Sequence, residues 1–190
     1  MQKTSLVLAL LLAGCAGNSA QRTVTPFHGD TIQLAPSQVE VINAMDNPFE
    51  DPSHVNLEER TAKAVEDWAR ETLMPGHTQG QFTFTIENVS FKRQGLEKAT
   101  KGLEGFFTKD QEERIQATVQ ARLEFRDGHG DAVRTGALRA GKQMTFPEGL
   151  TLNKKEARVE EFIQGLVKDL DGRLREALSE SLQGVTVSKL

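Results

Sequence analysis

Few side chains in this sequence are of types that do chemistry, and their spacing argues against the commonest sites. The four histidines, His28, His54, His77 and His129, all lie in predicted loops. No two of them have the spacing at which one helix offers a pair of ligands to zinc. The sequence contains no GxSxG nucleophile motif and no glycine-rich phosphate loop followed by the required lysine and hydroxyl residue. We therefore expect no catalytic residue, no metal and no cofactor.

Two acidic loops offer oxygen atoms that a cation can use. Residues 127–131 (DGHGD) bring two carboxylates and an imidazole together. Aspartate and glycine are also the residues that a tight hairpin needs, so we interpret this segment as a turn. A second group surrounds two prolines and consists of Asp46, Glu50, Asp51 and His54. It has the oxygen ligands that a hard cation prefers, but a solvated turn is the simpler interpretation.

The only cysteine, Cys15, ends a short apolar stretch near the start of the chain. Residues 1–5 carry one positive charge, and residues 6–13 are an eight-residue apolar run. A membrane-spanning helix needs about 20 apolar residues, so this run is too short. A basic start, a short apolar core and small residues before a cleavage site are typical of a secretory signal peptide. We predict a signal peptide over residues 1–14.

The residues Leu12, Ala13, Gly14 and Cys15 resemble the bacterial lipobox, whose cysteine is acylated and becomes the first residue of the mature protein. The resemblance implies that Cys15 carries palmitate-like acyl chains. Each buried methylene contributes about 0.8 kcal/mol, so two or more chains anchor a protein stably. The residue after Cys15 is alanine rather than aspartate, which implies the outer membrane, facing the periplasm. The alternative is an ordinary signal-peptide cysteine without lipid.

Composition restricts the class of partner. Removing residues 1–14 takes away one of the 23 basic residues, which leaves 22 basic and 27 acidic residues and a net charge of −5. The charges are interspersed, which argues against a basic patch for nucleic acid. Residues 15–30 are small and polar and read as a flexible tether. Residues 31–187 are enough for a single domain with its own core.

Apolar periodicity predicts the elements of that domain. Val39 and Val41 alternate with polar neighbours in a strand over 38–45. A helix then begins at Asn56, with Glu59 as its capping partner, and stops at residues 75–76, a Pro-Gly pair.

The next strand contains an irregularity. Phe82, Phe84 and Ile86 alternate with polar residues, but the apolar positions then move by one residue, to Val89 and Phe91. A shift of one residue would turn every later side chain to the other face of the sheet. We therefore predict a β-bulge near residues 87–88.

Two further strands and a long helix complete the pattern. Residues 115–126 alternate strictly, and the return strand over 138–146 does so except at Lys142. Asn153 and Glu156 predict a second capped helix start, followed by an apolar stripe to Leu182, with Gly184 as its stop. The predicted fold is α+β with the order β-α-β-β-β-α. Its antiparallel sheet of three to four strands carries two helices on one face.

The segment between the second and third strands carries four large apolar side chains among glycines and lysines: Leu96, Leu103, Phe106 and Phe107. One interpretation is a loop that folds back so that the two phenylalanines cover the core. The other is a mobile arm that offers an apolar patch to a membrane or a partner protein, because long loops without regular structure are often functional.

The order of a lipobox, a tether, a strand, a tryptophan-bearing helix, a meander and a long closing helix is similar to that of small proteobacterial envelope lipoproteins. It resembles the lipopolysaccharide-assembly lipoprotein and the auxiliary lipoproteins of envelope lipid transporters. We predict a non-catalytic accessory or scaffold subunit, because the domain is anchored and has no catalytic motif. We expect it to contact an envelope protein through the polar sheet face or through residues 103–107. The alternative is a carrier that binds lipid or a small apolar ligand between the sheet and the long helix.

Overall fold

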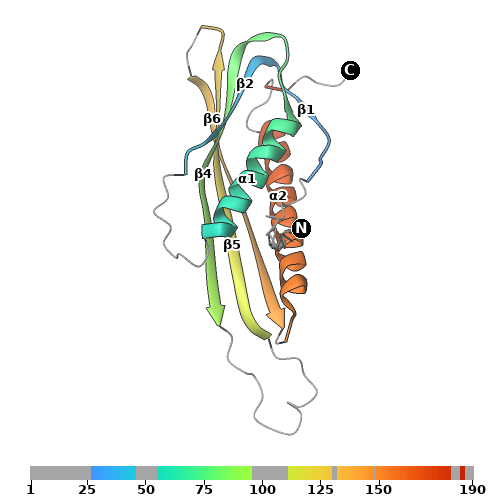
Figure 1. Ribbon diagram of the computed structural model, residues 1–190. Helices are drawn as coiled ribbons and strands as arrows, with labels where there is room; N and C mark the ends of the chain where they lie inside the picture. The colour runs from blue at the N-terminus through green and yellow to red at the C-terminus, as the bar shows by residue number, and fades with distance from the viewer. Residues whose placement is uncertain are drawn as a thin grey trace, which may run out of the picture.

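The computed structural model describes most of the chain from Phe27 onward. The described residues are 27–45, 55–95, 111–129, 132–147, 149–180 and 185–186. They form one layer of strands and one layer of two helices (Figure 1). Several predictions lie outside these residues: Cys15, the acidic loop residues 46–54, the stop at Gly184, and Leu96, Leu103, Phe106 and Phe107.

Four strands make the main sheet, in the spatial order β2-β4-β5-β6. Their bounds are Pro36–Asn43 for β2, Thr78–Gly95 for β4, Gln111–Asp127 for β5 and Ala132–Pro147 for β6. The pairs β4–β5 and β5–β6 are antiparallel, as predicted. Strand β2 instead runs parallel to β4. The difference has a physical reason, since a helix connects these two strands and returns the chain to the end of the sheet where β2 began.

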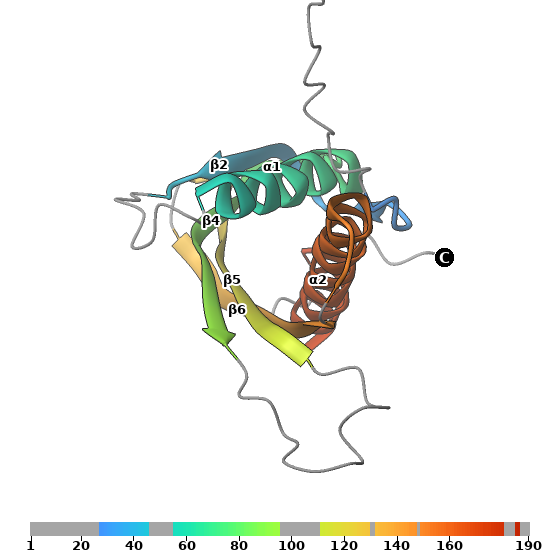
Figure 2. The same ribbon diagram turned by 60° about the horizontal axis from the view of Figure 1, so that its bottom comes forward.

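Both long helices pack on the same face of the sheet, which confirms the predicted α+β class. Helix α1 is Val55–Thr72 and helix α2 is Leu152–Glu180. Figure 2 shows the sheet curving around the two helices. Helix α1 packs on β4 and β2, whereas α2 runs along β5 and β6. No helix among the described residues is long and apolar enough to cross a membrane.

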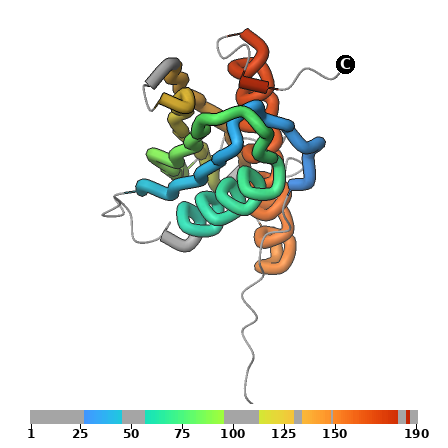
Figure 3. The backbone as a smooth tube through the Cα atoms, turned by 90° about the horizontal axis from the view of Figure 1, so that it is seen from above, coloured from blue at the N-terminus to red at the C-terminus, as the bar shows by residue number. Residues whose placement is uncertain are grey.

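A second, smaller sheet joins the start and the end of the domain. Strand β1 (Ile32–Gln33) pairs in parallel with β3 (Leu73–Met74), and Leu34 forms an antiparallel bridge with Thr186. These elements were not predicted, because two residues are too few to show a period. Seen from above, the N-terminal segment in blue lies on the helix side of the sheet (Figure 3).

The bulge in β4 is confirmed. The pairing of β4 with β5 shifts register between Ile86 and Asn88. Phe84 and Ile86 before the shift and Val89 and Phe91 after it are all buried. The extra residue therefore keeps the apolar side chains of both halves of the strand on the core side of the sheet.

The start of α2 differs from its prediction. The helix begins at Leu152, and the backbone amides of Lys154 and Lys155 both donate to the carbonyl oxygen of Thr151 at 3.0 Å. Asn153 therefore lies inside the first turn, and the predicted capping pair with Glu156 is wrong. The carboxylate of Glu156 instead accepts hydrogen bonds from Arg60 of α1 at 3.2 and 3.3 Å.

The core lies between the sheet and the two helices. Trp68 of α1 is fully buried and meets the ring of Phe84 edge-on, with 5.9 Å between ring centroids. Helix α2 contributes a stripe of fully buried side chains at the predicted spacing: Ile163, Leu166, Leu170 and Leu174. The predicted apolar stripe is thus confirmed over the described part of the helix.

Candidate interaction surface

No described element covers the outer face of the sheet, because both helices lie on its other face (Figure 2). Every second residue of β4, β5 and β6 points to it, and most of these side chains are polar. In the middle of the face the register aligns three rows across the strands. The rows are Asn88–Gln120–Arg139, Ser90–Thr118–Gly141 and Lys92–Gln116–Gln143.

The central row is low because Gly141 has no side chain. Together with its neighbours it makes a shallow hollow of about 130 Å³. The hollow is lined by Ser90, Lys92, Gln116, Thr118, Gln120 and Arg139. Hydroxyl and amide groups both donate and accept hydrogen bonds, so this surface can bind a polar partner in many arrangements.

Charge is unevenly distributed around the hollow. Arg122, on the outer face, pairs with Glu87 at 3.1 Å. Lys92 and Arg139, at opposite corners of the three rows, make no ion pair with any described residue. The middle of the outer face therefore presents net positive charge beside neutral hydrogen-bonding groups. No carboxylate or histidine is among the residues that line the hollow, so it contains no acid–base pair.

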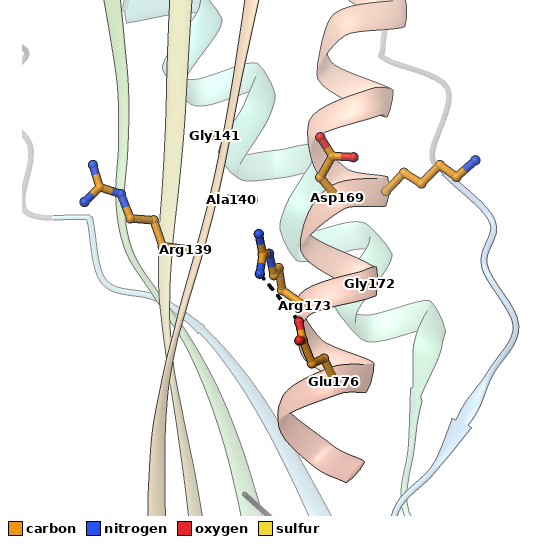
Figure 4. Close-up of a pocket in the computed structure, with 8 residues that line it drawn as sticks. Arg139, Ala140, Gly141, Asp169, Gly172, Arg173 and Glu176 are labelled. Carbon is orange, nitrogen blue, oxygen red and sulfur yellow. Dashed lines mark hydrogen bonds and ion pairs between the residues drawn. The ribbon is translucent and has the colours of Figure 1, made fainter. Parts of the chain in front are cut away.

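A second depression lies beside the outer face, between β6 and α2 (Figure 4). We call it the β6–α2 groove. It has a volume of about 370 Å³ and is lined by Arg139, Ala140, Gly141, Lys168, Asp169, Gly172, Arg173 and Glu176. Figure 4 shows Arg139 pointing away from α2, whereas Arg173 and Glu176 lie between the helix and the strand.

The described histidines are not brought together. His28 lies 3.1 Å from Glu71, and both side chains are exposed. His77 is exposed in the turn after β3. The backbone amide of His129 donates to the side chain of Asp127 at 2.9 Å, as expected for the predicted hairpin turn. Within the described part of the chain, no three residues of the metal-ligating types cluster.

The end of the predicted tether is attached to the helices. Arg175 of α2 donates to the backbone carbonyl of Asp30 and makes two hydrogen bonds with Asp171, at 2.8 and 3.1 Å. The bonds with Asp171 raise the pKa of Arg175 above its ordinary value. Phe27 packs against the core. The chain thus enters the domain on the helix side, opposite the outer face of the sheet.

The space between the sheet and α2, where the carrier alternative places its ligand, is occupied by side chains. Leu138 and Ala140 of β6, the strand that α2 packs against, and Ile163 and Leu166 of α2 are all buried. An apolar ligand of any size would have to displace this packing, which costs free energy. The geometry therefore favours a surface interaction over an internal ligand.

Comparison with known proteins gives structural similarity only. No protein-family model matches the chain, and no curated protein matches it. Bacterial lipoproteins are among the solved structures that resemble it. A minor lipoprotein from Acinetobacter baumannii is 10% identical, with a TM-score of 0.41, covering 82% of this chain and 99% of its own.

Two further structures resemble the chain to a similar degree. The rare lipoprotein B from Shewanella oneidensis is 9% identical, with a TM-score of 0.38, covering 75% of this chain and 96% of its own. An uncharacterized lipoprotein B from Nitrosomonas europaea is 12% identical, with a TM-score of 0.39 and coverages of 83% and 94%. At these identities and scores the likeness carries no argument about the role of this chain.

Sequence reasoning identified the polar face of the sheet but not its central hollow or the β6–α2 groove. Alternation assigns a side chain to a face, but it does not say which strands are neighbours. The alignment of Lys92, Thr118 and Arg139 depends on the registers of two strand pairs. The one available signal was the glycine at 141 in an otherwise regular strand, since a glycine there often marks a close approach.

Proposed function

We propose that this chain is a lipid-anchored outer-membrane lipoprotein that faces the periplasm. It serves as a non-catalytic accessory or scaffold subunit in envelope assembly or transport. The observation that carries the proposal is the outer face of the sheet, which is polar, regular and not covered by any described element. The anchor follows from the lipobox-like residues that end at Cys15.

The position of the chain's entry into the domain supports this arrangement. The segment at residues 27–30 is attached to α1 and α2 through the contacts of His28 and Asp30. This attachment lies on the helix side of the sheet, opposite the outer face. In an anchored protein that face is free to contact a partner. Its hydroxyl, amide and cationic groups suit a polar protein surface with some negative charge.

The anchor is tested by metabolic labelling with a clickable palmitate analogue. We expect label on the wild-type protein and none on Cys15→Ala, which should also leave the membrane fraction. Separation of the inner and outer membranes then shows which of the two contains the labelled protein. Labelling of Cys15→Ala at the wild-type level, or recovery of the wild type in the inner membrane, would contradict the proposed location.

The docking face is tested by photo-crosslinking in cells. A photoreactive residue replaces Gln120, on the outer face, or Glu161, on the exposed side of α2. We expect repeated capture of one envelope protein from position 120 and background capture from position 161. Adding Thr118→Arg to the first protein should abolish the capture by filling the hollow with a bulky cation. Equal capture from both positions would show that the outer face is not the docking surface.

The segment at residues 95–110, if it is an arm rather than a loop over the core, is a separate candidate for the same contact. Replacing Phe106 and Phe107 with serine should weaken the capture from position 120 if the arm also touches the partner. Unchanged capture would remove the arm from the proposal and leave the sheet face in it. Circular dichroism of each variant shows that the domain is still folded.

A further inference from the structure

The free edge of β6 has a defined set of backbone groups that point away from the sheet. Among the described strands β6 pairs only with β5, on one side, without a register shift from Arg134 to Phe146. Arg158 of α2 donates to the carbonyl oxygen of Thr145 at 3.4 Å, so that carbonyl points outward. In an antiparallel ladder the outward groups recur at every second residue. The other outward amides and carbonyls therefore belong to Thr135, Ala137, Arg139, Gly141 and Gln143.

Helix α2 covers one half of this edge. The contact of Arg158 with Thr145 and the ion pair of Lys142 with Asp169, at 3.2 Å, tie the later half of β6 to the helix. The middle of the strand, at residues 139–141, borders the β6–α2 groove (Figure 4). Natural sheets normally cover or charge such an edge, because an exposed row of amides and carbonyls accepts another strand.

Glycines keep the groove open on both walls. A Cβ atom placed on Gly172 of α2 would meet nothing within 4 Å. A Cβ atom on Gly141 of β6 would meet only ordinary contacts with β5, at 3.6 and 3.8 Å. An extended backbone can therefore approach β6 at this point without meeting a side chain from Gly141 or Gly172.

The charge around the groove is predominantly positive. Strand β6 contains Arg134, Arg139 and Lys142 and no acidic residue. The two carboxylates of the groove are already engaged, Asp169 by Lys142 and Glu176 by Arg173. Arg139 and Lys168 make no ion pair within the described part of the chain. The groove thus has cationic groups available and no available carboxylate.

We propose that β6 accepts an extended segment of a partner protein as an added strand, and that acidic and apolar residues alternate in this segment. Backbone hydrogen bonds to residues 135–141 would hold it. Directly opposed side chains in a sheet interact, so an acidic residue beside Arg139 gains a favourable pair. The intervening apolar residues would lie next to Leu138 and Ala140, on the core side. This surface shares Arg139 with the hollow of the outer face but lies along the edge of β6, and it does not depend on the lipid anchor.

The test uses the purified full-length acylated protein in detergent and two fluorescent eight-residue peptides. In one peptide valine alternates with glutamate, and in the other valine alternates with lysine. We expect the glutamate peptide to bind at least tenfold more tightly and to slow hydrogen exchange at residues 135–141. Arg139→Gln should reduce this preference. Equal binding of both peptides, or protection elsewhere in the domain, would overturn the proposal.

Matched variants separate strand addition from simple charge attraction. Gly141→Pro removes an outward amide but leaves the ladder with β5 intact, and it should weaken binding at least tenfold. Gly141→Ala keeps the amide and adds only a methyl group on the side of Thr118, so it should weaken binding far less than Gly141→Pro. Wild-type binding by a folded Gly141→Pro variant would overturn the proposal.

Modified peptides test strand addition without any change to the protein. A glutamate peptide with N-methyl groups on one backbone edge cannot form the ladder and should not bind, whereas methylation of the other edge should be tolerated. Binding of both methylated peptides would overturn the proposal. So would self-association through this edge, measured by sedimentation without peptide, because the occupant would then be a second copy. Crosslinking from position 120 reports separately on the outer face.

Discussion

The side chain of Lys142 in β6 reaches Asp169 in α2 by passing over Gly165. Its Nζ atom lies 3.2 Å from Oδ2 of Asp169. A Cβ atom placed on Gly165 would lie 2.8 Å from Cε and 2.9 Å from Nζ of Lys142. The lysine that interrupts the apolar alternation of β6 and the glycine inside α2 are therefore parts of one arrangement. The glycine leaves room for the stem of the lysine, and the carboxylate one turn later receives its charge.

This arrangement predicts different outcomes for two glycine-to-alanine changes in α2. Alanine is favoured over glycine inside a helix by about 0.8–1.0 kcal/mol. Gly172→Ala meets open space, so it should raise the free energy of unfolding by about 1 kcal/mol. Gly165→Ala should raise the free energy of unfolding by less, because the new methyl group displaces the side chain of Lys142. The displacement breaks the exposed ion pair with Asp169, which contributes about 0.2–1 kcal/mol. Urea denaturation measures both changes.

The double variant Lys142→Ala with Gly165→Ala provides the control. Without the lysine side chain to displace, Gly165→Ala should raise the free energy of unfolding by its full amount when compared with Lys142→Ala alone. Gly165→Ala in the wild-type background could instead raise the free energy of unfolding as much as Gly172→Ala does. That result would show that the side chain of Lys142 does not need the space left by Gly165.

Among the described glycines Gly76 makes the closest approach to another backbone segment, and we expect Gly76→Ala to be severely destabilising. A Cβ atom there would lie 2.2 Å from the carbonyl oxygen of Leu34 and 2.5 Å from that of Ala35. The two segments cannot move apart, because the amides of Gly76 and Thr78 donate to the carbonyls of Pro36 and Ala35 at 2.8 and 2.9 Å. The expected loss is about 2–3 kcal/mol or more in urea denaturation.

Gly95→Ala is the matched control for Gly76→Ala. A Cβ atom on Gly95 would meet nothing within 4 Å. Its effect should stay within about 0.5 kcal/mol, as is usual for surface positions. Similar effects for the two variants would show that the crossing at Gly76 is looser than described.

The elements that sequence reasoning predicted correctly are those whose signal repeats many times. The alternation in β5 and the stripe in α2 extend over more than ten residues, so a single exception such as Lys142 does not hide the period. The bulge in β4 was predictable for a related reason. The apolar positions on both sides of residues 87–88 are regular, so the point where they change phase is evident from the sequence.

The features that sequence reasoning missed depend on which segments are neighbours in space. The period of β2 shows which side chains face the core but not the direction of its partner, so its parallel pairing with β4 was not predicted. The pairing of β1 with β3 involves two residues on each side. The β6–α2 groove combines Arg139 with Lys168, which are 29 residues apart, and each reads as an ordinary solvated cation.

Arg175 should be needed for attachment of the N-terminal segment. Its guanidinium group makes two hydrogen bonds with Asp171, which is only 8% exposed, and a third with the backbone of Asp30. Arg175→Met leaves a buried carboxylate without its cation, and hydrogen bonds to charged groups contribute about 1.5–3 kcal/mol. We expect a loss of that size in urea denaturation and faster hydrogen exchange at residues 28–32.

The neighbouring arginine gives the comparison for that experiment. Arg173 pairs with Glu176 at 3.5 Å, and both side chains are more than half exposed. Arg173→Met should therefore change the free energy of unfolding by about 0.5 kcal/mol or less. An equal loss for the two arginine variants would mean that burial of Asp171 is not what makes Arg175 important.

Trp68 allows the cost of an unsatisfied polar group to be measured in the core. It is the only tryptophan, it is fully buried, and its indole N–H has no hydrogen-bond partner among the described residues. Trp68→Ala leaves a large cavity and should cost about 3–5 kcal/mol. Trp68→Phe keeps a ring against Phe84 and removes the unpaired N–H, whose burial costs about 1–3 kcal/mol. Removal of the unpaired N–H offsets much of the free energy lost with the apolar contacts. We therefore expect Trp68→Phe to lower the free energy of unfolding by about 1.5 kcal/mol or less. Urea denaturation followed by circular dichroism compares the two variants, and similar costs would show that the indole N–H is hydrogen-bonded.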